Sequence, residues 1–203
     1  MDVVPIQLSP LILLGGASGS GKSYLAHRFG RPHVELDNFY REISEHTPET
    51  PLPQTGYGEI DWDHAGTWNC ALAVDALVDL LESGATEVPN YAISTSSYDS
   101  MRRIELSGGP LVAEGIFVSE ILAPLQRLGV PVRAYYIEVS ALGTAIRRLV
   151  RDVRERRKPL PFLLKRGYAL FRADRDIRAR HLAAGFEPVK KKALKETLAS
   201  ITS

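Results

Sequence analysis

A stretch near the start of the chain combines three glycines with a lysine and a serine. It reads Gly16-Ala17-Ser18-Gly19-Ser20-Gly21-Lys22-Ser23, which is the GxxxxGK[ST] spacing of a phosphate-binding loop. Backbone N–H groups can surround a phosphate chain only where no side chain obstructs them, so such a loop needs glycines. Lys22 can then reach the outer phosphates as a point charge, and the Ser23 hydroxyl can ligate Mg²⁺. The pattern predicts a site for a nucleoside triphosphate; the alternative is a glycine-rich turn that binds nothing.

Two carboxylates are expected beside this loop. Residues 34–37 alternate like a short strand that ends on Asp37, and the apolar run 110–115 carries Glu114 near its end. In an open parallel sheet ligands bind outside the carboxyl ends of the strands, so both side chains should face one crevice. One carboxylate can accept a proton from an attacking hydroxyl, and the other can hold Mg²⁺ or its waters. The alternative for Asp37 is a carboxylate that caps a turn with Asn38.

A basic segment lies in the second half of the chain. Residues 141–157 are expected to form a long helix, which ends at Lys158 and the prolines around it. Arg148, Arg151 and Glu155 share one face of this helix through their spacing. Since charge spreads over the phosphoryl oxygens during phosphoryl transfer, such a helix can bring cations over the site. The alternatives are a solvated face or a nucleic-acid stripe, and the stripe is disfavoured because no aromatic residues are interleaved.

The rest of the chain alternates short apolar runs with amphipathic segments. This alternation predicts an α/β fold with a doubly wound, mostly parallel sheet flanked by helices. Residues 41–66 are rich in Pro, Gly, Thr and Glu and are expected to form a long loop. Strands are expected at 11–14, 34–37, 87–91, 103–106, 110–115, 130–139 and 185–189, and helices at 24–29, 68–83, 119–128, 141–157, 162–184 and 190–200.

Composition narrows the class of protein. The 203 residues suit a single domain over 1–203. The net charge of +1 gives no reason to expect a nucleic-acid or membrane partner. Cys70 is the only cysteine, which excludes an intrachain disulfide and favours a reducing compartment. The first apolar run is too short to span a bilayer, so a cytoplasmic protein is expected.

Several segments resemble the uridine kinase-like branch of P-loop kinases, which also includes phosphoribulokinase and a bacterial type of pantothenate kinase. The resemblance covers most of the chain in consistent order, and it implies that 41–66 and 89–106 lie on the acceptor side and that 147–165 form a lid. It implies a kinase that uses ATP and Mg²⁺ to phosphorylate a small-molecule hydroxyl, with the 5′-hydroxyl of uridine or cytidine as the leading acceptor. The matching segments are residues 16–23, 37–40 (Asp-Asn-Phe-Tyr), 61–64 (Asp-Trp-Asp-His), 89–91 (Pro-Asn-Tyr), 112–115 (Val-Ala-Glu-Gly) and 148–158.

The resemblance implies roles on the acceptor side. In the family, the Asp of the D-x-F-Y motif is the general base and touches the metal shell, which implies these roles for Asp37. We place Tyr40, from the same motif, with the acceptor-binding residues. The motif around F-D-H implies that Asp63 binds ribose hydroxyls, and the P-x-Y motif implies that the Tyr91 ring lies beside the base. Together with the residue chemistry, the implied metal ligands are Ser23, Asp37 and Glu114.

The family's lid, R-x-x-R-D-x-x-x-R-x-R, matches Arg148, Arg151, Asp152 and Arg156, with Lys158 in the last basic position. It implies that Arg151 and Arg156 act with Lys22 on the transferring phosphoryl group. Arg148 is assigned to both nucleotide and acceptor, and Lys158 to the acceptor. Lysine at this position keeps the charge but loses the bidentate fork of arginine.

The acceptor side departs from the family pattern. Tyr91 is followed by Ala92 and Ile93 where the family has Asp-Phe, and Ser96 stands near the position of a family His. A second pair, Tyr98-Asp99, is an alternative register. The other functions that remain open are a kinase for another alcohol, such as a pantothenate-like compound or a sugar, and a nucleotide-dependent switch. The choice between ATP and GTP and the oligomeric state stay open, and Phe186 to Pro188 lie where the family packs the adenine.

Overall fold

The structure is a computed structural model, and it describes residues 10–17, 19–139 and 175–202. Ser18 of the phosphate loop and the whole expected lid, 147–165, lie outside the described residues. The expected roles of Arg148, Arg151, Arg156 and Lys158 therefore stay predictions from the sequence.

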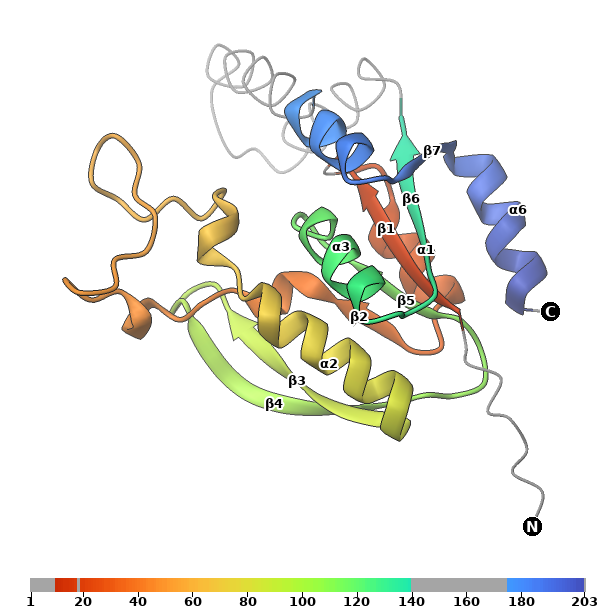
Figure 1. Cartoon of the computed structure of the whole chain (residues 1–203), viewed down its shortest axis with the longest axis horizontal. Helices are drawn as coiled ribbons and strands as arrows, with labels where there is room; N and C mark the ends of the chain where they lie inside the picture. Colours follow the sequence, from red (N-terminus) through yellow and green to blue (C-terminus); the bar gives the residue numbers. More distant parts are fainter. Residues whose placement is uncertain (1–9, 18, 140–174, 203) are drawn as a thin grey trace, which may run out of the picture.

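A five-stranded parallel sheet forms the centre of the fold (Figure 1). Its strands lie in the order β2-β5-β1-β6-β7, so that β1 is central and the chain winds outward in both directions. The predicted α/β fold with a doubly wound parallel sheet is confirmed, because all four strand pairs are parallel. The strands are β1 (Leu11–Gly16), β2 (His33–Glu35), β5 (Leu111–Glu114), β6 (Val132–Glu138) and β7 (Glu187–Lys190).

The apolar runs of the sequence become the buried strands of this sheet. Leu11 to Leu14 of β1 are all 0% exposed, and β5 is buried along its whole length. A strand that is covered on both faces reads as a continuous hydrophobic run, because no side chain on it meets water. This burial fixes the end of β1, and with it the start of the phosphate loop.

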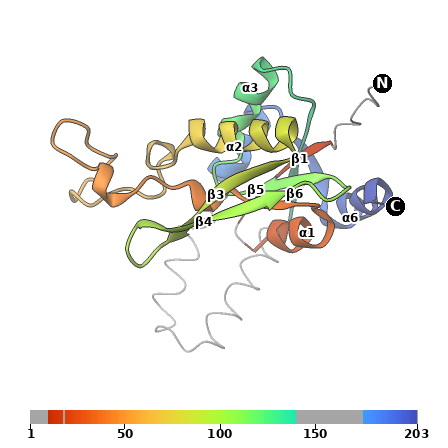
Figure 2. The ribbon, with the colours of Figure 1, turned by 90° about the horizontal axis from the view of Figure 1, so that it is seen from below.

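Helices cover the two faces of the sheet (Figure 2). Helices α1 (Lys22–Phe29) and α6 (Lys191–Thr202) pack on one face, where Leu25, Leu194 and Leu198 share a core cluster with Ile12 and Leu14. Helices α2 (Cys70–Ser83) and α3 (Ser119–Arg127) lie on the other face, above the second core cluster. Residues 175–183 form a further helix. No described helix is both long enough and apolar enough to cross a bilayer.

A separate antiparallel hairpin, β3 (Ala85–Ala92) and β4 (Ser97–Glu105), lies under α2. Its strands are longer than the expected 87–91 and 103–106, because the polar first half of β4 is exposed and carries no apolar signal. The loop 41–66 contains two short elements at its ends, η2 (Ile43–Glu45) and the start of η3 (Ala65–Thr67). Helix α2 begins two residues later than expected, because the Asn69 side chain caps it by accepting from the Leu72 N–H at 3.0 Å.

Candidate active site

The phosphate loop joins the end of β1 to the start of α1. Gly19 and Gly21 have φ values of 79° and 93°, a conformation that a residue with a Cβ adopts at a cost. A Cβ on Gly16 would lie 2.7 Å from the Ser20 hydroxyl oxygen, so the loop also needs a glycine there. The loop backbone therefore leads directly into the N-terminus of α1, where the helix dipole favours an anion.

Lys22, the first residue of α1, points to the end of β5. Its Nζ lies 3.8 Å from Oε2 of Glu114, and Oε1 of the same carboxylate lies 3.8 Å from Nε2 of His33 on β2. Glu114 is buried, and its Oε2 atom accepts no hydrogen bond from the part of the chain that the structure describes. Burial alone would raise the pKa of Glu114, but His33, Lys22 and the Ser23 hydroxyl outweigh it and lower the pKa. Glu114 is therefore an ionised carboxylate at the phosphate loop.

Asp37 lies one turn beyond β2. The sequence placed it at the end of a strand over 34–37, but β2 ends at Glu35 and Asp37 belongs to the short helix η1 (Leu36–Phe39). The Asp37 Oδ1 atom accepts the Ile116 N–H at 2.9 Å, which fixes the carboxylate over the end of β5. Gly115 permits this approach, because a Cβ there would lie 2.8 Å from the same oxygen. The expected meeting of Asp37 and Glu114 at one sheet edge thus occurs, although a helical turn and not a strand end positions Asp37.

Burial raises the pKa of Asp37 above its usual range, even though the Ile116 N–H and the charge of Lys22 lower it. Asp37 is exposed by its solvent-accessible surface, yet enough protein atoms lie around its carboxylate to desolvate it. The charges of Lys22 and Glu114 both act on it, so the three groups belong to one site. A carboxylate with a raised pKa is a stronger base than an ordinary aspartate, which suits it to take a proton from a hydroxyl.

An aromatic cavity lies next to Asp37. Its volume is about 210 Å³, and it is lined by Tyr40, Trp62, Tyr91, Ile93 and Ser96. The three rings pack against one another, with centroids 5.9 Å apart for Tyr40 and Trp62 and 5.5 Å apart for Tyr40 and Tyr91. Burial and the nearby charges of Asp37 and Asp63 raise the pKa of Tyr40. Asp63 itself is exposed and lies at the edge of this group.

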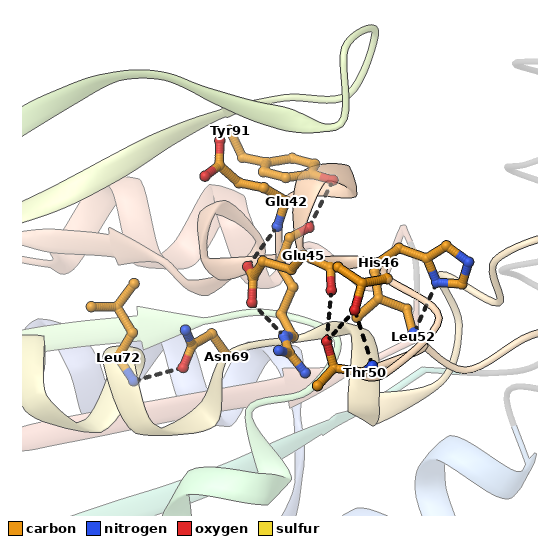
Figure 3. Close-up of polar contacts among 10 residues, drawn as sticks. Glu42, Glu45, His46, Thr50, Leu52, Asn69, Leu72 and Tyr91 are labelled. Atoms are coloured by element: carbon orange, nitrogen blue, oxygen red, sulfur yellow. Dashed lines mark hydrogen bonds and ion pairs between the residues drawn. The ribbon is translucent and has the colours of Figure 1, made fainter.

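Hydrogen bonds join the residues on either side of the hairpin turn to the segment that follows Asp37, and Figure 3 shows the one from the Tyr91 hydroxyl. The Tyr91 N–H donates to Oδ1 of Asn38 at 3.2 Å, and the Tyr91 hydroxyl donates to the carbonyl of Arg41 at 3.4 Å. The Tyr98 N–H donates to Oε1 of Glu42 at 2.9 Å. The cavity is therefore assembled from segments far apart in the sequence, which these contacts join.

The two candidate registers of the hairpin, one with Tyr91 and one with Tyr98-Asp99 at the acceptor site, place different residues relative to the cavity. Tyr91 lines the cavity, whereas the Tyr98 ring packs on Tyr91 at 6.2 Å and does not line it. Asp99, the partner of Tyr98 in the alternative register, is exposed on β4. The geometry thus brings Tyr91 and not Tyr98 to the cavity. The contacts that Tyr40, Asp63 and Tyr91 would make with an acceptor stay predictions.

The residues around Glu114 fit a magnesium ion. Among the residues with described positions, no three His, Cys, Asp or Glu side chains form a metal-binding group. Mg²⁺ needs fewer, because it keeps several waters and is held by one or two protein oxygens together with phosphates. The buried Oε2 of Glu114 without a hydrogen-bond partner and the Ser23 hydroxyl at the start of α1 are such oxygens. The predicted ligand set of Ser23, Asp37 and Glu114 is compatible with this geometry and stays a prediction.

Two features of the site were not foreseen from the sequence. Trp62 was part of a matching motif, but its ring was not expected in the cavity wall, and a tryptophan between two aspartates in a loop was the available signal. His33 gave no signal, because a single histidine in a three-residue strand has no pattern. Phe186 is only 3% exposed and packs on His181 with ring centroids 4.9 Å apart, so its ring belongs to the core, and the expected adenine position at Phe186 to Pro188 stays a prediction.

The chain is similar in sequence to curated uridine kinases. No family model matches the chain. A curated uridine kinase of Staphylococcus haemolyticus is 27% identical over 153 residues, which are 72% of this chain and 70% of that protein. A curated uridine kinase of Clostridium tetani is 27% identical over 157 residues, which are 74% of this chain and 71% of that protein.

Solved structures give the fold. A candidate fructose transport system kinase from Silicibacter sp. TM1040 superposes with a TM-score of 0.59 at 18% identity, covering 86% of this chain and 87% of that one. At this identity the likeness concerns the architecture alone. With the sequence similarity to two curated uridine kinases, it confirms the resemblance: the chain is similar to uridine kinases in sequence and has the fold of a P-loop kinase.

Proposed function

We propose that the chain is an ATP- and Mg²⁺-dependent kinase that phosphorylates a primary hydroxyl of a small molecule, with a pyrimidine nucleoside as the favoured acceptor. The observation that carries the proposal is that Asp37 interacts electrostatically both with Lys22 and Glu114 at the phosphate loop and with Tyr40 in the wall of the aromatic cavity. A base with a raised pKa at this position lies where an acceptor in the cavity and a phosphate chain on the loop would meet.

Each side chain has a role in this proposal. The loop backbone and Lys22 bind the phosphates, and Lys22 neutralises charge that develops on the transferring group. Asp37 takes the proton of the acceptor hydroxyl as its oxygen bonds to the γ-phosphorus, while the bond from that phosphorus to the bridging oxygen of ATP breaks and ADP leaves. Glu114 and Ser23 would hold Mg²⁺, which supplies charge neutralisation on the phosphate oxygens when bound. The rings of Tyr40, Trp62 and Tyr91 hold the acceptor, and Asp63 binds its hydroxyls.

The nucleoside is favoured because the curated relatives in this comparison are named uridine kinases and because a flat ring can stack in an aromatic cavity. A second acceptor class, a sugar, is supported by the name of the Silicibacter protein and by the Ser96 that stands near the position of the family His. Both classes use the same phosphoryl transfer, so they differ only in what the cavity binds.

The test is ATP turnover with Mg²⁺ in the presence of uridine, cytidine, pantothenate, fructose or other sugars. We expect uridine or cytidine to stimulate turnover, and Asp37→Asn to abolish the stimulation. Asp75→Asn is the matched control, because Asp75 is an exposed carboxylate on α2, away from the cavity. If a sugar stimulates turnover and no nucleoside does, the sugar replaces the nucleoside as the proposed acceptor. A rate of ATP hydrolysis that no acceptor changes would favour a nucleotide-dependent switch and contradict the kinase proposal.

A further inference from the structure

A second lysine lies at the phosphate loop. Lys191 is the first residue of α6, directly after β7, and α6 packs on α1 through Leu194 and Leu198. Its Nζ atom occupies the space that a Cβ on Gly21 would need, and it lies 5.4 Å from the centroid of the Tyr24 ring. The ammonium group is thus held against the last glycine of the loop from the side of α6.

The position of this ammonium group is electrostatically unfavourable without an anion. It lies at the N-terminal end of α1, where the helix dipole is positive, and Lys22 is already there. The first turn of α1 contains no acidic residue, and no carboxylate of the described residues lies within ion-pair distance of Lys191. The ring of Tyr24 offers a cation–π contact but no compensating charge. The ammonium group of Lys191 and the positive end of α1 therefore both lie at the loop where a polyphosphate would bind, whereas the Lys22 ammonium already has Glu114 as a partner.

The sheet order decides which part of the nucleotide is near Lys191. Asp37 and Tyr40 follow β2, and Asp37 is hydrogen-bonded to Ile116, which follows β5; both strands lie on one side of β1. Lys191 follows β7, which lies on the other side of β1, beyond β6. In phosphoryl transfer the attacking and leaving oxygens lie roughly in line on opposite sides of the phosphorus. The leaving nucleoside diphosphate therefore extends from the loop toward β6 and β7.

We propose that Lys191 is a second donor-binding cation, which contacts the phosphates that stay on the nucleoside diphosphate after transfer. Tyr24 positions the ammonium group from the outer side of α1. The inference rests on the proposed function, because it takes a nucleoside triphosphate as the ligand of the loop. It assigns Lys22 to the transferring phosphoryl group and Lys191 to the phosphate nearest the nucleoside, whose charge does not change when the bond to the transferring phosphorus breaks.

This division of labour predicts a kinetic signature. An interaction that is equal in the ground state and in the transition state changes KM without changing kcat. Removing the charge in Lys191→Met should weaken binding of both ATP and ADP about 10-fold, which corresponds to one charge-assisted contact. The KM for ATP should rise by a similar factor, with kcat changed less than about threefold. Lys191→Arg should keep most of the affinity, because it keeps the charge.

The experiment measures ATP and ADP affinity by calorimetry for the wild-type protein and the variants, followed by turnover. Lys192→Met and Lys195→Met are matched controls, since both lysines are exposed on the same helix. An ATP affinity of Lys191→Met equal to that of the two controls would overturn the inference, as would a loss confined to kcat. A wild-type protein that binds no ATP would instead overturn the proposed function, so the two failures are distinguishable.

Discussion

The phosphate end and the acceptor end of the site are built in different ways. At the phosphate end, the backbone between β1 and α1 forms the loop, and the strand that leads into it is completely buried. At the acceptor end, side chains from separate segments form the cavity, and Ile93 in its wall is 87% exposed. Backbone recognition depends on glycines at fixed spacing, whereas a side-chain cavity can change one residue at a time. The residues of the phosphate loop are therefore constrained by backbone geometry, and the residues of the cavity by the shape and chemistry of the acceptor.

Lys22→Met tests the phosphate end most severely. Because Lys22 is placed to neutralise charge on the transferring group, its loss should lower kcat by about 10²- to 10³-fold. The measurement is turnover with whichever acceptor stimulates the wild-type protein. Lys195→Met, which removes an exposed lysine from α6, should keep wild-type turnover. A decrease of less than about 10-fold in Lys22→Met would mean that the loop backbone alone supports transfer.

Gly15→Ala tests how tightly the end of β1 is packed. A Cβ on Gly15 would lie 2.6 Å from Nε2 of His181 and nearer still to Cδ2, and the imidazole is buried. Overpacking of this kind should lower the free energy of unfolding by about 1–3 kcal/mol. Urea unfolding measures the change, and Gly56→Ala is the control because nothing lies within 4 Å of a Cβ there.

The same pair allows a sharper check on the packing. In a double-mutant cycle, His181→Ala should remove the obstacle, so that adding Gly15→Ala to it costs less than adding it to the wild type. Equal costs in both backgrounds would show that His181 is not what Gly15 accommodates. A cost below about 0.5 kcal/mol in the wild type would show that the helix at 175–183 can move aside.

Much of the phosphate end is readable from the sequence. The apolar run before Gly16 predicts the buried strand, and the spacing of Gly16, Gly21 and Lys22 predicts the loop. Both are readable because neighbouring residues in the sequence determine them. The approximate position of Glu114 follows from the same reasoning. What local patterns could not give is the short helix that carries Asp37, since a contact with Ile116, far along the chain, fixes that turn.

The acceptor end was less readable. The roles of Tyr40 and Tyr91 came from a resemblance and not from periodicity, and the register of the hairpin was left open. Its register depends on bonds such as the one from the Tyr91 N–H to Asn38, which join residues 53 positions apart. The turn between the strands also contains Ser96 with a positive φ of 49°, which its neighbours in the sequence do not announce. Long-range contacts decided what the sequence alone could not.

Trp62→Leu tests the acceptor end without touching the phosphate end. Removing the ring that packs on Tyr40 and Tyr91 should raise the KM for the acceptor about 3- to 10-fold, as expected for one aromatic contact. The affinity for ATP should stay unchanged. Steady-state kinetics with both substrates varied gives both values. Tyr57→Leu is the control, because Tyr57 lies in the same loop and is 96% exposed. An equal change in the KM for ATP would show that the two ends are coupled.

Alkaline pH should lower the free energy of unfolding through Tyr98, a phenol in the hairpin at the acceptor end. Burial, followed by the nearby charges of Glu45 and Glu42, raises the pKa of Tyr98 to about 12. In the unfolded chain a tyrosine has a pKa of about 10, so between these values the unfolded state loses its proton while the folded state keeps it. The free energy of unfolding should therefore fall as the pH rises through this interval. Tyr98→Phe removes the group and should make the pH dependence less steep, whereas Tyr57→Phe, at an exposed position, should leave it as in the wild type. Urea unfolding at several alkaline pH values measures the slopes. Equal slopes for Tyr98→Phe and the wild type would show that the hairpin packing does not hold this phenol in its neutral form.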